Sequence, residues 1–182
     1  MSATQEAPGD LELVRRFVNT LEIEDRVDEL ADPAALGRWL RAHGLLRGGS
    51  RPDNADVVAA RRLREAIRTL LLENNGVSVR KEAAVVLSRT AQRVGLAPVF
   101  DPGGHARLAP AASGVDGALG RVVAVVAEAM ADGTWTRLKA CRAEDCRWAF
   151  YDHARNRSRH WCSMAVCGNR TKARTYRRRH AV

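Results

Sequence analysis

The stretches Cys141-Arg-Ala-Glu-Asp-Cys146 and Cys162-Ser-Met-Ala-Val-Cys167 contain all four cysteines of the 182-residue chain. Both pairs have the spacing C-x4-C, with fifteen residues between the pairs, which is typical of a metal site. Zn²⁺ accepts four thiolates at about 2.3 Å, and four thiolates leave no coordination position for water. The pattern therefore predicts one structural zinc site with Zn²⁺ as the cofactor and Cys141, Cys146, Cys162 and Cys167 as its ligands.

The alternatives to zinc are two disulfides, four buried thiols, or iron. Residues 1–10 contain no basic region followed by an apolar stretch, so no signal peptide is expected and the predicted location is the cytoplasm, where thiols stay reduced. His153 and His160 lie between the cysteine pairs and could replace a ligand, but four thiolates already complete a tetrahedral site. No feature of the sequence favours a redox role for iron.

The residues around the cysteines predict a zinc finger over residues 136–182. Residues 147–151 have strand character, residues 157–161 could form the returning strand, and residues 168–180 contain no proline and predict a helix. A zinc knuckle, a β-hairpin and a helix in this order make a treble-clef-like finger. So few aliphatic residues could not fold the segment alone, and zinc binding supplies about 10 kcal/mol in such cases.

The positive charge of the chain is concentrated in this finger. The formal net charge is +9, and residues 141–182 alone contain eleven Arg or Lys against three Asp or Glu. Such a block predicts a polyanionic partner, here a nucleic acid, although a solvated basic helix is the alternative. Helical spacing places Arg170, Arg174 and Arg177 or Arg178 on one face. The predicted nucleic-acid-binding residues are Arg157, Arg159, Arg170, Lys172, Arg174, Arg177 and Arg178.

The rest of the chain predicts a mainly α protein. Residues 1–9 are expected to be a disordered tail, and residues 10–135 a helical domain with one short β-hairpin. No stretch approaches the roughly 18 apolar residues of a membrane span, so no membrane partner is expected. Capping and breaking residues predict helices from Asp10 to Leu21, Asp32 to Gly44, Asp53 to Gly76, Ser78 to Gly95 and Asp116 to Met130, with hairpin arms at residues 97–100 and 105–108.

Three segments of the tail carry a resemblance to a known family. Cys141-x4-Cys146-Arg-Trp-x-Phe-Tyr-Asp152, Arg159-x-Trp-Cys-Ser-Met164 and Cys167-Gly-Asn-Arg-x-Lys172 closely resemble the CGNR zinc finger. Upstream, residues 17–21, 39–45 and 63–67 are similar to the ABATE domain, which usually precedes that finger. The resemblance implies zinc at the four cysteines and DNA binding by the finger, in a family of proposed stress-induced bacterial transcription regulators. Ala154 and His160 depart from the pattern at positions where Ser and Arg are expected.

These features predict a DNA-binding transcriptional regulator. The helical domain would sense a signal or dimerise, so a homodimer or a small-molecule effector could be involved. The alternative is an RNA-binding or ribosome-associated zinc module in which Trp148, Phe150, Tyr151 and Trp161 stack on unpaired bases. Nothing in the sequence predicts an enzyme, because no nucleophile–base pair, phosphate-binding glycine loop or H-E-x-x-H motif is found.

Overall fold

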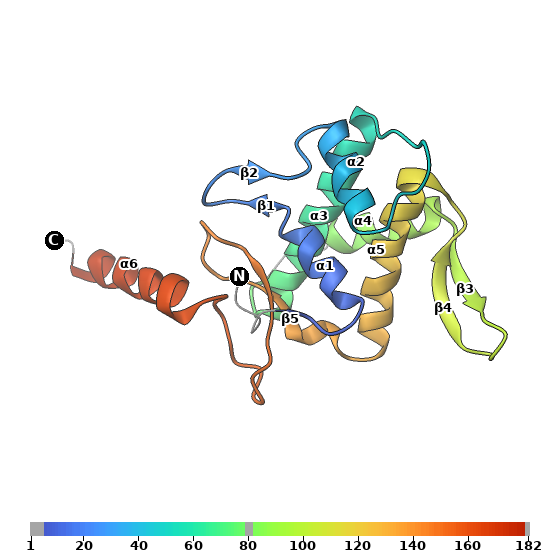
Figure 1. Ribbon diagram of the computed structural model, residues 1–182. Coiled ribbons are helices and arrows are strands. Elements are labelled where there is room, and N and C mark those ends of the chain that lie inside the picture. Colours follow the sequence, from blue (N-terminus) through green and yellow to red (C-terminus); the bar gives the residue numbers. More distant parts are fainter. Residues whose placement is uncertain (1–5, 79–81, 181–182) are drawn as a thin grey trace.

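A computed structural model describes residues 6–78 and 82–180 of the chain. Five helices form its helical body (Figure 1). The β3–β4 hairpin projects from this body at one end and helix α6 (Asn169–His180) at the other. The body helices are α1 (Leu11–Val18), α2 (Pro33–Ala42), α3 (Asn54–Asn74), α4 (Glu82–Arg93) and α5 (Gly114–Ala131), and the hairpin is β3 (Leu96–Phe100) with β4 (Ala106–Pro110).

The predicted helix boundaries hold where a side chain caps the first turn. Asp32 accepts a hydrogen bond from the Ala35 N–H at the start of α2. Asp53 and Asp56 form a reciprocal capping box at the start of α3. These two helices are confirmed, as are the predicted hairpin and α5, which begins two residues before Asp116. The predicted cap of α4 by Ser78 involves residues 79–81, which lie outside the described residues.

The prediction fails at the end of the first helix. Helix α1 ends at Val18, and Leu21 lies in β1 (Leu21–Glu22), which pairs antiparallel with β2 (Val27–Asp28). Polar contacts explain the early end, because Asn19 and Thr20 make tertiary and local hydrogen bonds in place of another helical turn. Of the expected tail, residues 1–5 lie outside the described part of the chain. Residues 6–9 contact the rest of the protein, since Ala7 is buried and its N–H donates to Glu12.

The strand pairing of the finger also differs from the prediction. Strand β6 (Ala149–Tyr151) pairs antiparallel with β5 (Leu138–Ala140), which precedes the first cysteine pair. The predicted returning strand at residues 157–161 is therefore wrong, and those residues form a loop without a ladder partner among the described strands. The β5 segment takes this role because Leu138 and Ala140 are fully buried against α3, whereas residues 157–160 are mostly exposed.

Strands β5 and β6 are part of the main hydrophobic core. Leu138, Ala140, Ala149 and Tyr151 belong to the same cluster of buried side chains as the helices of the body. A second, smaller cluster surrounds the cysteines and contains Phe150. The two faces of the β5–β6 hairpin therefore pack on different cores, as expected for a strand whose side chains alternate between faces.

Side-chain amides join the hairpin to the helices. Asn19 Nδ2 donates to the Ala149 carbonyl at 2.9 Å, and Asn19 Oδ1 accepts from the Ala149 N–H at 2.7 Å. At the other end, Asn74 donates to the carbonyl of Leu138 and Asn75 donates to that of Ala140. The amides satisfy backbone groups of β5 and β6 that would otherwise be buried without partners.

Buried arginines connect α3 to the β1–β2 segment and to the finger. Arg64 is 2% exposed and donates two hydrogen bonds to the Asp28 carboxylate. Burial alone raises the pKa of Asp28, but the hydrogen bonds from Arg64 and the Leu30 N–H, together with the charges of Arg64 and Arg61, outweigh burial and lower the pKa. Arg68 donates to the carbonyls of Val18 and Arg147, so one guanidinium contacts both the body and the finger.

Helix α6 (Asn169–His180) differs from every other helix described, because none of its residues is buried. It continues from η3 (Met164–Gly168) and extends away from the body (Figure 1). None of the described helices is long and apolar enough to cross a membrane.

Candidate metal centre and basic surface

The four cysteines come from three places in the fold. Cys141 directly follows β5, and Cys146 lies three residues before β6, so the first pair forms the tip of the β5–β6 hairpin. Cys162 ends the long loop after β6, and Cys167 lies in η3 at the base of α6. The turn at the first pair has Arg147 in the left-handed region, with φ +53°. This conformation folds the chain back so that both thiols of the pair lie on one side.

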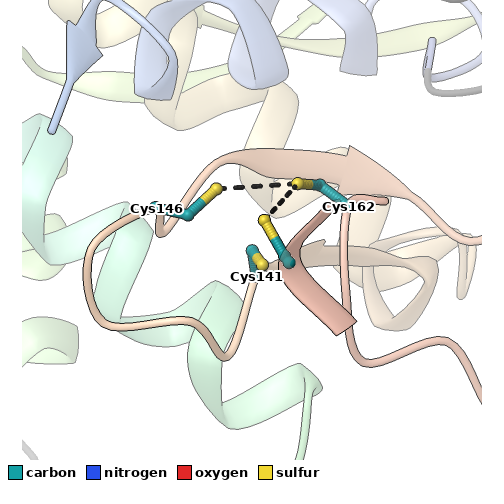
Figure 2. A group of neighbouring side chains, drawn as sticks. Cys141, Cys146 and Cys162 are labelled. Carbon is teal, nitrogen blue, oxygen red and sulfur yellow. Dashed lines mark hydrogen bonds between the residues drawn. The ribbon is translucent and has the colours of Figure 1, made fainter. Parts of the chain in front are cut away.

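The sulfur positions fit a tetrahedral zinc ion. All four Sγ atoms lie within 4.8 Å of one another. The Cys146–Cys162 and Cys162–Cys167 sulfur pairs are each 3.6 Å apart. A tetrahedron with Zn–S bonds of about 2.3 Å has edges of about 3.8 Å, which agrees with those separations. Figure 2 shows Cys141, Cys146 and Cys162 converging on one point.

The electrostatics of the cluster show what four thiolates at this site would need. The Cys146 and Cys162 thiols hydrogen-bond to the Cys141 sulfur, which lowers the pKa of Cys141. The same interactions raise the pKa of Cys146 and of Cys162, because each further thiolate would lie beside an existing negative charge. Four thiolates can therefore coexist only around a positive ion. Zn²⁺ held by these residues closes the coordination sphere and acts as a scaffold.

The histidines considered as alternative ligands have other partners. His153 Nε2 is 2.8 Å from the Glu6 carbonyl oxygen. His160 Nδ1 is 2.9 Å from Asn75 Oδ1, at the junction with α3. Neither ring belongs to the group of ligand atoms that the described residues bring together.

Aromatic residues build the small core around the cysteines. Phe150 is fully buried and Tyr151 is 7% exposed, while Trp148 and Trp161 are half-buried against the cysteine cluster. The Arg159 guanidinium carbon lies 5.2 Å from the centre of the Phe150 ring, and its Nη2 donates to the Cys162 carbonyl. Arg159 therefore supports the metal centre from outside, a position that the sequence did not reveal.

The structure divides the predicted basic residues into paired and unpaired groups. Arg170 donates to Glu24 at 2.5 and 3.1 Å, and its Nη2 lies 3.7 Å from the Cys167 sulfur. Arg174 donates to Asp145 at 2.5 Å, and Asp145 also lies 3.4 Å from Arg170 Nε. Among the described residues, no ion pair is formed by the predicted Arg157, Lys172, Arg177 and Arg178, nor by Arg179, which was not among the predicted residues.

The acidic partners of these arginines were not predicted. Glu24 lies in the turn between β1 and β2, and Asp145 lies inside the first cysteine pair. The hydrogen bond from Arg174 lowers the pKa of Asp145, and the bond to Glu24 raises the pKa of Arg170. The position of Asp145 inside the first C-x4-C pair is the one sequence signal that could have predicted its contact with the basic helix. No feature of the sequence around Glu24 indicates that this residue contacts the finger.

The fold and the site define a helical protein with a C-terminal four-cysteine zinc finger. Residues 137–180 match the model of the CGNR zinc finger. Residues 11–133 match the model of the ABATE family, described as "Putative stress-induced transcription regulator". Because the second match covers more than half of the chain, the chain belongs to the ABATE family. The two matches stand in the predicted order, and the resemblance seen in the sequence is confirmed. No curated protein matches the chain in sequence.

Proposed function

We propose that this transcription-regulator-like protein binds duplex DNA through the basic surface of its zinc finger. The observation that carries the proposal is α6, a twelve-residue helix with no buried residue that extends beyond the body. A helix about 10–12 Å in diameter fits the major groove of B-DNA, which is about 12 Å wide. Four cations on α6 lack carboxylate partners among the described residues, namely Lys172, Arg177, Arg178 and Arg179.

The burial of the aromatic residues disfavours the RNA alternative. Stacking on unpaired bases requires exposed aromatic faces. Phe150 and Tyr151 are buried, and Trp148 and Trp161 pack against the cysteine cluster. Two of the four predicted stacking platforms are thus closed to a ligand, whereas the charge on α6 is open to a phosphate backbone.

The helical body is the part of the protein that we propose responds to a signal. Asn19 and Thr20, the two polar residues after α1, both hydrogen-bond to protein backbone and are therefore not available to a ligand. A groove of about 780 Å³ runs between α3 and α4 and is lined by Arg62, Glu65 and Val86. We assign the signal response, whether an effector or a second copy of the chain, to this outer α3–α4 face. Light scattering with size-exclusion chromatography measures the molar mass in solution and so shows whether the chain forms a dimer.

The test of DNA binding is its dependence on salt. A labelled random-sequence duplex is titrated with the zinc-loaded protein, and fluorescence anisotropy is measured between 50 and 400 mM salt. If the four unpaired cations each contact one phosphate, the slope of log K against log salt is about −3.6. A slope near zero, or no association at 50 mM salt, refutes the proposal. If single-stranded RNA competes at least tenfold better than duplex DNA, the RNA alternative replaces it.

A further inference from the structure

The two sides of α6 have different electrostatic surroundings. One side carries Arg170 and Arg174, whose charges are balanced by Glu24 and Asp145. The β1–β2 segment supplies Glu24 and belongs to an acidic stretch, residues 22–29, with five carboxylates against one arginine. A phosphate backbone that approaches the first two turns of α6 on this side would meet these carboxylates; Arg177, which helical spacing places on the same side, lies beyond them and forms no ion pair with a described residue.

The opposite side of α6 is open. Lys172 and Arg179 are seven residues apart and therefore lie on the same face, about half a turn away from Arg170. Both are exposed and form no ion pair with any described residue. Tyr176 lies between them, is 64% exposed, and stacks on His180 with ring centres 4.1 Å apart. This face therefore offers two cations and one aromatic ring, all three of them exposed.

The paired arginines have a role within the fold. Arg170 joins three groups: Glu24 of the body, Asp145 of the first cysteine pair, and the sulfur of Cys167. Arg174 extends the contact to Asp145 by one helical turn. Because α6 has no buried side chain, these bonds tie its first turns to the metal centre and to β1–β2.

From this arrangement we propose that α6 meets DNA phosphates with the face that carries Lys172, Tyr176 and Arg179. Arg170 and Arg174 are positioning residues, which hold the start of α6 against Asp145 and Glu24. The inference rests on the proposed DNA binding and assigns the face used for it. It differs from the prediction made from the sequence, in which Arg170 and Arg174 contact the nucleic acid together with Lys172.

Two double variants that each remove two positive charges test this assignment. Lys172→Ala with Arg179→Ala removes the open face, and Arg170→Ala with Arg174→Ala removes the paired one. With the random-sequence duplex, the first variant should make the salt slope shallower by about 1.8 and weaken binding at 0.1 M salt on the order of 10- to 100-fold. The second should keep the wild-type slope, whatever its effect on affinity, because a positioning role releases no counterions from DNA.

A charge swap gives the second test. Arg174→Asp alone should weaken binding, and Asp145→Arg added to it should restore affinity to within about threefold by remaking the ion pair in the reverse direction. If Arg174 contacts phosphate, the swap cannot restore binding, since position 174 stays negative. Zinc content and circular dichroism of each variant show that the finger is intact.

Each outcome decides one of the two claims. The assignment of the face is overturned if the salt slope becomes shallower by about 1.8 in the Arg170/Arg174 variant, or becomes shallower by the same amount in both double variants. The proposed DNA binding stands in either case. Failure of the charge swap to restore affinity also overturns the assignment. Absence of salt-dependent binding by the wild-type protein refutes the proposed function, and the assignment falls with it.

Discussion

Replacing Asp152 by asparagine removes the carboxylate at the centre of the finger's long loop. Asp152 is 0% exposed, and its Oδ2 is 2.8 Å from the ammonium of Lys139, which is 3% exposed. The same carboxylate accepts the backbone N–H groups of Ala154 and Arg159, each at 3.0 Å. The substitution preserves the shape of the side chain but leaves the Lys139 charge buried without its counter-ion.

The expected loss of stability in Asp152→Asn follows from the burial of both Asp152 and Lys139. Breaking a buried ion pair by removing one partner costs about 3–5 kcal/mol, because the remaining charge is uncompensated. Lys139 keeps the carbonyls of Arg157 and Arg159 as acceptors. We therefore expect the lower half of the range, about 3 kcal/mol. This loss is a large share of the 5–15 kcal/mol of stability that is typical of a folded protein.

The assay is urea unfolding of the zinc-loaded protein, followed by circular dichroism at pH 7. Three variants complete a cycle: Asp152→Asn, Lys139→Met and the double variant. The double variant should be less destabilised than the sum of the two single variants, since neither charge then remains alone. A cost below 1 kcal/mol for Asp152→Asn, or additive effects of the two substitutions, would refute the account of a buried, coupled pair.

The Asp152–Lys139 ion pair also predicts that the stability of the protein depends on pH. Burial alone raises the pKa of Asp152, but the hydrogen bond from Lys139 and two backbone N–H groups outweigh it and lower the pKa. A carboxyl whose folded pKa is lowered contributes stability above its unfolded pKa of about 3.9 and loses it as pH falls through the folded value. Wild type should therefore lose more stability between pH 5 and pH 2 than Asp152→Asn does. Equal losses would contradict the lowered pKa.

Three further predictions concern the core and the metal. Asn19→Ala should cost about 1–3 kcal/mol in urea unfolding, because it leaves the buried N–H and C=O of Ala149 unpaired. Gly120→Ala should cost about 1–3 kcal/mol, since its Cβ would lie 2.7 Å from Pro110 Cβ. Gly49→Ala, with nothing within 4 Å, is the matched control and should be nearly neutral. Chelation should release one zinc per chain, measured with a chromogenic indicator, and lower the midpoint of thermal unfolding; an unchanged midpoint would show that zinc does not support the fold.

Sequence alone predicted what is encoded locally. The capping residues Asp32 and Asp53 fixed two helix starts, and the cysteine spacing identified the metal ligands as a group. Such signals depend on residues within one or two turns of each other. They need no knowledge of which segments meet in space, and this is why they succeeded.

The errors arose where a distant segment decides the local structure. Residues 157–161 follow β6 in the chain and could have formed its antiparallel partner, but β5 occupies the position beside β6 because Leu138 fills the main core. Helix α1 ends early because Asn19 bonds to Ala149, 130 residues away along the chain. Arg170 looked free because its partner Glu24 lies 146 residues earlier. None of these pairings has a signature within the segment itself.

The shared core of β5 and the body helices has a geometric consequence. Leu138 and Ala140 are packed among the helices, Cys141 follows at once, and Arg170 in α6 pairs with Glu24 of the β1–β2 segment, so the metal centre and the start of α6 are both joined directly to the body. The direction of α6 is therefore set by the body. If two copies associate through their helices, their two α6 helices are held at a fixed distance from each other. Such a pair would measure the distance between two stretches of a duplex, and a signal that tilts one body against the other would change the distance it accepts.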